Sequence, residues 1–159
     1  RDSLKVLASE TFTSVSAPIQ YAAIAAYNND HSEYINNSKN ILKAVGEYVY
    51  NNLKSNNIII NKPQGGFYLM PEFVNKNFSS SDEMCSDILK KTGVVLLPGS
   101  DFGFSKNKMI VRLSFTDFDG RTFMKNVSDT ENIDDNLLSK FAPNIVDGVN
   151  KLKRWSESS

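Results

Sequence analysis

Arg112 is the residue of this sequence whose setting most strongly suggests ligand chemistry. It stands in the segment V-R-L-S-F at 111–115, where its neighbours are mostly apolar. A guanidinium is permanently charged, so within such a segment it must reach water or meet an anion. Two interpretations follow. Strand alternation directs Arg112 to solvent, which the segment taken alone favours, or Arg112 lies in a cleft and binds a carboxylate through two parallel hydrogen bonds.

The other candidate groups have simpler structural explanations. Lys39 falls on the polar face of a predicted helix, where a solvated ammonium is expected rather than a reactive amine. Cys85 occupies a helical position among apolar residues and is expected to be a buried thiol, and His31 only begins a helix. Gly65-Gly66 predicts a turn, and Asp101-Phe102-Gly103 matches a kinase metal-binding triplet without the segments that accompany it.

Composition and charge argue against several classes of function. The 18 basic and 18 acidic residues cancel, whereas nucleic-acid and anionic-membrane partners require a basic surplus. One cysteine and one histidine provide neither an internal disulfide nor an ordinary metal site. No apolar run is long enough to span a bilayer, and residues 1–20 lack the arrangement of a signal peptide. We therefore expect one reduced, cytoplasmic protein domain.

The strand pattern predicts an α+β domain with a small, mostly antiparallel sheet and helices packed on one face. The apolar residues of the last predicted strand need burial, so we expect that strand to be paired on both sides. The predicted strands cover residues 58–61, 66–71, 94–97 and 109–115.

Helical spacing of apolar residues predicts the remaining elements. An alanine-rich helix begins near Ser16 and Pro18, whereas residues 3–12 have no clear period and the stretch from 116 to 135 is polar. The other predicted helices are a long one from about 31 to 55 capped by Asp30 or Ser32, one at 81–91 capped by Ser81, and one at about 136–155 that Pro143 interrupts or restarts.

Four segments in this order resemble the C-terminal part of the class I/II aminotransferases, which are fold-type-I enzymes dependent on pyridoxal phosphate. The resemblance runs from Thr11 to about Phe118 and more loosely through the last helix. It implies transfer of an amino group between an L-amino acid (aspartate-like, alanine or aromatic) and a 2-oxo acid, in a homodimer. The segments are S-V-S-A-P-I-Q-Y-A-A at 14–23, P-Q-G-G-F-Y-L at 63–69, G-V-V-L-L-P-G-S-D-F-G at 93–103 and V-R-L-S-F at 111–115.

The resemblance assigns roles to individual residues. Arg112 matches the family's arginine that binds the α-carboxylate of the substrate, in agreement with the bidentate interpretation above. Phe67, which follows Gly66 in the G-G-F-Y segment, matches a residue that lines the substrate pocket. Ser14 and Ser16 match the region where the family's chain meets the cofactor near the dimer interface, so the resemblance implies a contact with the cofactor phosphate, including across the dimer. In the same way, the turn at 98–103 is expected to shape the pocket.

The residues that carry out catalysis and hold the cofactor in this family have no counterpart in this chain. Its aldimine-forming lysine, its phosphate-binding arginine, the aspartate on the pyridine nitrogen and the ring-stacking aromatic residue all precede the matching segments. We therefore expect no catalytic residue and no metal site in this chain. Residues 1–30 are expected to be the tail of the large cofactor domain with a linking helix, and residues 31–159 the C-terminal small domain.

Three functional hypotheses remain open from the sequence. In the favoured one, the chain is part of an aminotransferase and is inactive alone. In the second, it is a stand-alone module in which Arg112 binds an amino acid or another carboxylate without turnover. In the third, Arg112 is solvated and purely structural. An upstream coding sequence with N-x-x-N-P-x-G and Ser-x-Ser-Lys blocks would exclude the second hypothesis.

Overall fold

The computed structural model describes residues 1–12, 14–74, 76–127 and 132–158. It contains two compact units, residues 1–35 and residues 36–159, which are described separately. In the first unit, all but the last of residues 3–12, which have no clear period, belong to helix α1 (Asp2–Thr11), and the predicted alanine-rich helix is α2 (Ala17–Asn28). Neither α1 nor α2 contains a buried residue, although both carry large apolar side chains.

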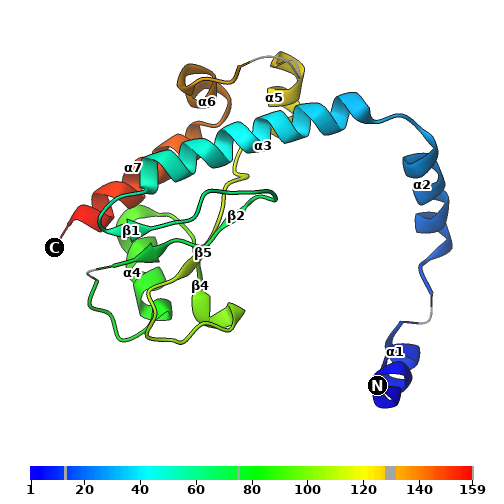
Figure 1. Cartoon of the computed structure of the whole chain (residues 1–159), viewed down its shortest axis with the longest axis horizontal. Coiled ribbons are helices and arrows are strands. Elements are labelled where there is room, and N and C mark those ends of the chain that lie inside the picture. The colour runs from blue at the N-terminus through cyan, green and yellow to red at the C-terminus, as the bar shows by residue number, and fades with distance from the viewer. Residues whose placement is uncertain (13, 75, 128–131, 159) are drawn as a thin grey trace. The chain divides into compact units, whose positions relative to one another are not determined.

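The second unit combines helices with short antiparallel strands, so the predicted α+β class is correct (Figure 1). Long helix α3 runs along the strands of this unit. The elements in chain order are α3 (Ser32–Leu53), β1 (Ile58–Ile59), β2 (Tyr68–Leu69), β3 (Glu72–Phe73), α4 (Ser81–Thr92), β4 (Leu97–Pro98), the 3-10 helix η1 (Gly99–Phe102), β5 (Val111–Ser114), α5 (Gly120–Asn126), α6 (Asp135–Phe141) and α7 (Pro143–Glu157).

Helix α3 buries one stripe of apolar residues against the core. Its buried residues Ile41, Val45, Val49 and Leu53 recur every fourth position, which places them on one face. Of the two predicted caps, Asp30 and Ser32, Asp30 lies before the helix, where its carboxylate accepts the Ser32 amide at 2.9 Å, and Ser32 is the first helical residue. The helix ends two residues earlier than expected.

One glycine lets α3 approach the strands closely. A Cβ atom at Gly46 would lie 3.1 Å from the ring of Phe115 and 3.3 Å from Pro63. The helix therefore rests directly on the end of β5 at this position.

The central strand is β5, paired on one side with β2 and on the other with β4, as predicted for 109–115. Tyr68 lies opposite Ser114 on one side, and Leu97 lies opposite Arg112 on the other. Both pairings are antiparallel, and the hydrogen-bonded strand is shorter than predicted, covering 111–114.

The predicted strand 66–71 is divided into β2 and β3. Pro71 stands between them and has no N–H to donate. Its carbonyl still accepts the Val111 amide at 3.1 Å, and the Phe73 amide donates to Met109 at 2.9 Å, so the register along β5 continues past the break. Strand β3 also pairs with β1, which covers only 58–59 of the predicted 58–61.

The predicted strand 94–97 is wrong in its position, since the observed strand is β4 (Leu97–Pro98). Helix α4 ends at Thr92, Gly93 follows it in the left-handed conformation, and the Thr92 hydroxyl accepts the Val94 amide at 3.0 Å. This turn keeps residues 94–96 out of the hydrogen-bonded ladder. Leu96 is nevertheless buried in the core.

Alternation along β5 separates two faces. Val111, Leu113 and Phe115 are buried in the core with residues of α3, α4 and α7, whereas Arg112 is half-buried and Ser114 exposed on the other face. Helices therefore cover one face of the sheet, as the pattern predicts. The opposite face is where Arg112 lies.

Two helix predictions need correction. Ser80 rather than Ser81 caps α4, since the Ser80 hydroxyl accepts the Glu83 amide at 3.2 Å, while Ser81 is fully buried inside the first turn. Helix α5 lies within the stretch read as polar. Asp119 caps it by accepting two backbone amides, and buried Phe123 attaches it to the core.

The last helical region consists of two helices. Helix α6 ends at Phe141, and Pro143 occupies the first turn of α7, as the sequence indicates. Within the described residues, no helix is long and apolar enough to cross a membrane.

Trp155 joins α7 to α4. Its indole N–H donates to the Asp87 carboxylate at 2.9 Å, and Lys91 contacts the other carboxylate oxygen at 3.0 Å. The indole is buried and packs edge-on against Phe73 at a centroid distance of 5.3 Å. The Trp155 hydrogen bond, followed by Lys91, lowers the pKa of Asp87.

The backbone at Gly99 lies too close to β5 to accommodate a side chain. A Cβ atom there would lie 2.8 Å from the carbonyl oxygen of Ile110, which also accepts the Gly99 amide. We expect Gly99→Ala to lower the free energy of unfolding by about 1–3 kcal/mol through overpacking. Gly65→Ala is the control, because nothing lies within 4 Å of its Cβ position. Equal urea midpoints for both variants would contradict the described β4–β5 pairing.

The Asp87–Trp155 bond predicts a pH-dependent stability. Asp87 has a lowered pKa in the folded chain, so its contribution is present above the unfolded pKa of about 3.9 and is lost as the pH falls through the folded value. Relative to Asp87→Asn, the wild type should be more stable by roughly 1 kcal/mol at pH 7, and the difference should shrink below about pH 4. Urea unfolding of both proteins at several pH values measures the difference in their free energy of unfolding. A difference that does not change with pH would refute the assigned role of the Asp87 carboxylate.

Candidate functional site

Arg112 projects from the middle of the central strand, on the sheet face that the helices do not cover. Strands β2 and β4 flank it, and both edges of β5 are hydrogen-bonded. The backbone beneath Arg112 is therefore fixed by pairing on two sides. Its side chain is half-buried.

Two aromatic rings lie within cation–π distance of the guanidinium of Arg112. Its Cζ atom lies 4.5 Å from the centroid of the Tyr68 ring and 4.4 Å from the centroid of the Phe102 ring. Tyr68 comes from β2 and Phe102 from η1, on opposite sides of β5. At these distances each ring attracts the cation through its quadrupole. We call Tyr68, Arg112 and Phe102 the arginine clamp.

The charge of Arg112 is not neutralised within the part of the chain that the structure describes. No carboxylate of the described residues lies within ion-pair distance of its guanidinium, and no hydrogen bond to these residues engages its N–H groups. A guanidinium is planar and carries its N–H donors in its own plane. The arrangement can bind a planar anion such as a carboxylate through two parallel hydrogen bonds.

The turn after β4 supports Phe102. The Gly99 amide donates to Ile110 at 2.8 Å, and the Ser100 hydroxyl donates to Asp82 on α4 at 3.1 Å. Gly103 ends the turn with a φ of +85°, a conformation that favours glycine. The turn at 98–103 thus connects β4 to the arginine clamp.

Phe67 and Gly66 adjoin the arginine clamp at the start of β2. The Phe67 ring lies 4.4 Å from the Tyr68 ring, centroid to centroid, and is 39% exposed. Gly66 has a φ of +68°, with open space where a Cβ would lie. Phe67 therefore neighbours Arg112 through Tyr68, and its contact with a substrate stays a prediction, as does that of Gly66.

Ser14 and Ser16 belong to the first unit, residues 1–35. Both are exposed, and Ser16 stands at the N-cap of α2 without a side-chain cap bond. Their predicted contact with a cofactor phosphate stays a prediction.

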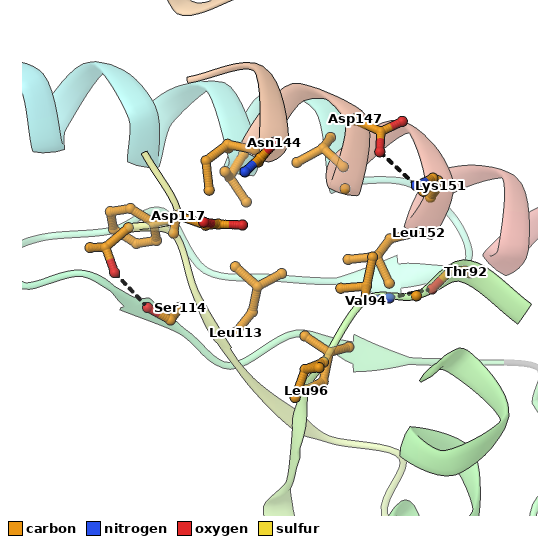
Figure 2. Close-up of a pocket in the computed structure, with 18 residues that line it drawn as sticks. Thr92, Val94, Leu96, Leu113, Ser114, Asp117, Asn144, Asp147, Lys151 and Leu152 are labelled. Carbon is orange, nitrogen blue, oxygen red and sulfur yellow. Dashed lines mark hydrogen bonds and ion pairs between the residues drawn. The ribbon is translucent and has the colours of Figure 1, made fainter. Parts of the chain in front are cut away.

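A cavity of about 480 Å³ lies between α7 and the strand residues near Leu96 and Leu113 (Figure 2). Most of its polar groups already have partners: Asp147 pairs with Lys151 at 2.7 Å, and the Ser114 and Thr116 hydroxyls bond each other at 3.1 Å. Asp117 points into the cavity. Arg112 does not line this cavity.

The nucleophiles of the described residues are poorly suited to catalysis. Burial raises the pKa of Cys85 to about 11, so its thiol is protonated at neutral pH. Lys39, like every other lysine of the chain, is exposed or half-buried rather than enclosed. Among the described positions, no three His, Cys, Asp or Glu side chains gather to hold a metal ion.

Tyr68 is a site residue to which no sequence pattern assigns a role. Alternation directs the side chains of Tyr68 and Leu69 to different faces of β2, but the position of Tyr68 beside Arg112 depends on the register that pairs it with Ser114. The G-G-F-Y segment identifies the residue without its role. Phe102 was expected only as part of a turn that shapes the pocket.

Comparisons with known proteins agree with this fold. A family model described as "Aminotransferase class I and II" matches residues 2–122. The aspartate aminotransferase of Sulfolobus acidocaldarius is 26% identical over 152 residues, or 93% of this chain and 34% of that protein. The aspartate aminotransferase of Bacillus sp. (strain YM-2) is 33% identical over 102 residues, or 61% of this chain and 26% of that protein.

Solved structures show the same fold. Alanine aminotransferase from Pyrococcus furiosus has a TM-score of 0.67 at 22% identity, covering 89% of this chain and 30% of that chain. The aspartate aminotransferase from Rhizobium meliloti has a TM-score of 0.66 at 17% identity, covering 96% of this chain and 34% of that chain. The chain thus spans about a third or less of the length of these relatives. Since the family model matches most of it, this chain belongs to the class I and II aminotransferases.

Proposed function

We propose that this chain supplies the substrate-carboxylate site of a pyridoxal-phosphate-dependent aminotransferase, with Arg112 binding the α-carboxylate. The whole protein transfers an amino group between an L-amino acid and a 2-oxo acid. Family membership supports the reaction class. The observation that carries the site assignment is the guanidinium of Arg112, whose Cζ atom lies 4.4 and 4.5 Å from the centroids of two aromatic rings and which has no carboxylate partner among the described residues.

The substrates share the group that Arg112 is suited to bind. Amino acids and 2-oxo acids both carry a planar carboxylate next to the reacting carbon, so one guanidinium serves both half-reactions. Relatives named aspartate and alanine aminotransferases suggest an aspartate-like or alanine substrate, and an aromatic one is also compatible with the proposal. We further propose that the whole protein is a cytoplasmic homodimer.

The described residues do not form a pyridoxal phosphate site by themselves. This cofactor supplies an electron sink when it is bound, and it needs an enclosed lysine and an anion cradle. Each lysine here is exposed or half-buried, and Gly65-Gly66 leads into β2 rather than into a helix N-terminus that could hold phosphate. What the chain's own residues do in the proposal is bind and orient the substrate carboxylate.

Replacing Arg112 by lysine tests the assignment. Arg112→Lys keeps the charge and removes the planar fork, so in the whole enzyme it should raise KM and lower kcat/KM by at least about tenfold. Arg154→Lys is the matched control, because Arg154 is exposed on α7. Steady-state kinetics with amino acid and 2-oxo acid measure both variants. Unchanged kinetics in Arg112→Lys would remove this residue from the site.

A second experiment tests whether this chain, without the rest of the enzyme, binds the cofactor. Pyridoxal phosphate is added to the 159-residue chain, followed by borohydride and mass spectrometry of the peptides. Because each lysine is exposed or half-buried, we expect weak labelling spread over several lysines, and no amino transfer. The urea-unfolded chain provides the control distribution. Stoichiometric labelling of one lysine in the folded chain only, with turnover, would contradict the proposal, and Lys39 would be examined first.

A further inference from the structure

We infer that Tyr68 and Phe102 are positioning residues that hold the Arg112 guanidinium edge-on to its ligand and thereby select a planar carboxylate over a tetrahedral anion. This inference rests on the proposed function of Arg112. To that function it adds a role for Tyr68 and Phe102 and a preference for carboxylates over tetrahedral anions, both of which follow from the arginine clamp.

In the proposal, the two rings of the arginine clamp lie against the two flat faces of the guanidinium. The Tyr68 and Phe102 rings lie at nearly equal distances, 4.5 and 4.4 Å from Cζ, and they come from elements on opposite sides of β5. Rotation of the guanidinium out of its plane would require one ring to move. The rings therefore fix the direction in which its N–H groups point.

An in-plane approach favours one shape of ligand. Both oxygens of a carboxylate lie in the guanidinium plane when they accept two parallel hydrogen bonds. A phosphonate or sulfonate can present two oxygens in the same way, but its third oxygen leaves the plane toward a ring. That oxygen then loses water without gaining a hydrogen-bond donor. The arginine clamp consequently disfavours tetrahedral anions.

Each ring is itself held in place. Tyr68 belongs to β2 and contacts the Phe67 ring at 4.4 Å. Phe102 ends η1, whose Gly99 amide is bonded to Ile110 and whose Ser100 hydroxyl is bonded to Asp82. Both rings remain partly exposed, at 44% and 40%, so the edge of the arginine clamp is open to a ligand.

The experiment uses the whole enzyme with Tyr68→Leu, Phe102→Leu and the conservative variant Tyr68→Phe. Phe104→Leu is the matched control, because Phe104 is equally exposed, at 40%, and does not stack on Arg112. The probes are the amino-acid substrate and its aminophosphonate analogue as a competitive inhibitor. Thermal unfolding of each variant verifies that it is folded.

We expect each leucine variant to raise KM by about two- to fivefold with little change in kcat, since the loss of one cation–π contact weakens ground-state and transition-state binding equally. The ratio of the inhibition constant of the aminophosphonate to the KM of the amino acid should fall by a similar factor. Tyr68→Phe keeps the ring, so its KM and its preference for carboxylate over phosphonate should equal those of the wild type. The same is expected of Phe104→Leu. In an Arg112→Lys background, Phe102→Leu should have no further effect.

Two failures are distinguishable. If Arg112→Lys impairs the enzyme but the leucine variants match Phe104→Leu in both KM and selectivity, the inference is wrong and the proposed function stands. If Arg112→Lys itself has no effect, the proposed function is wrong. A loss of kcat in folded leucine variants with unchanged selectivity would also overturn the positioning role.

Discussion

The pairing of β5 on both edges is the constraint on which the other features depend. It fixes alternation along the strand, so that Val111, Leu113 and Phe115 enter the core while Arg112 emerges on the opposite face. The same pairing brings β2 and β4 to either side of Arg112. Because β2 carries Tyr68 and the turn after β4 carries Phe102, the two rings arrive at the guanidinium from both directions. The site is therefore a consequence of strand order as much as of residue type.

Alternating burial and helical spacing allowed the α+β class, α3, the central strand and the exposed face of Arg112 to be predicted from the sequence. The stacking partners could not be predicted, because the place of Tyr68 depends on its register with Ser114 and that of Phe102 on a single 3-10 turn. Helix α5 was not predicted because it is short and mostly polar, and Phe123 is its one buried residue. Pro71, by contrast, marks a strand break that its missing N–H explains.

Arg112 illustrates how two interpretations of one residue can both hold in part. Alternation does direct it away from the core, as the solvated interpretation requires. The rings of Tyr68 and Phe102 nevertheless leave it half-buried and oriented, which a freely solvated arginine is not. An oriented cation without a protein carboxylate among the described residues is available to a ligand carboxylate. Membership in the aminotransferase family then suggests which carboxylates those are.

A crystal structure of the whole enzyme with a bound 2-oxo acid would show directly which cation binds the substrate carboxylate. We expect both carboxylate oxygens within hydrogen-bond distance of the Arg112 guanidinium and in its plane, with the Tyr68 and Phe102 rings against its two faces. A carboxylate bound by another cation, with the Arg112 side chain directed away from the ligand, would contradict it.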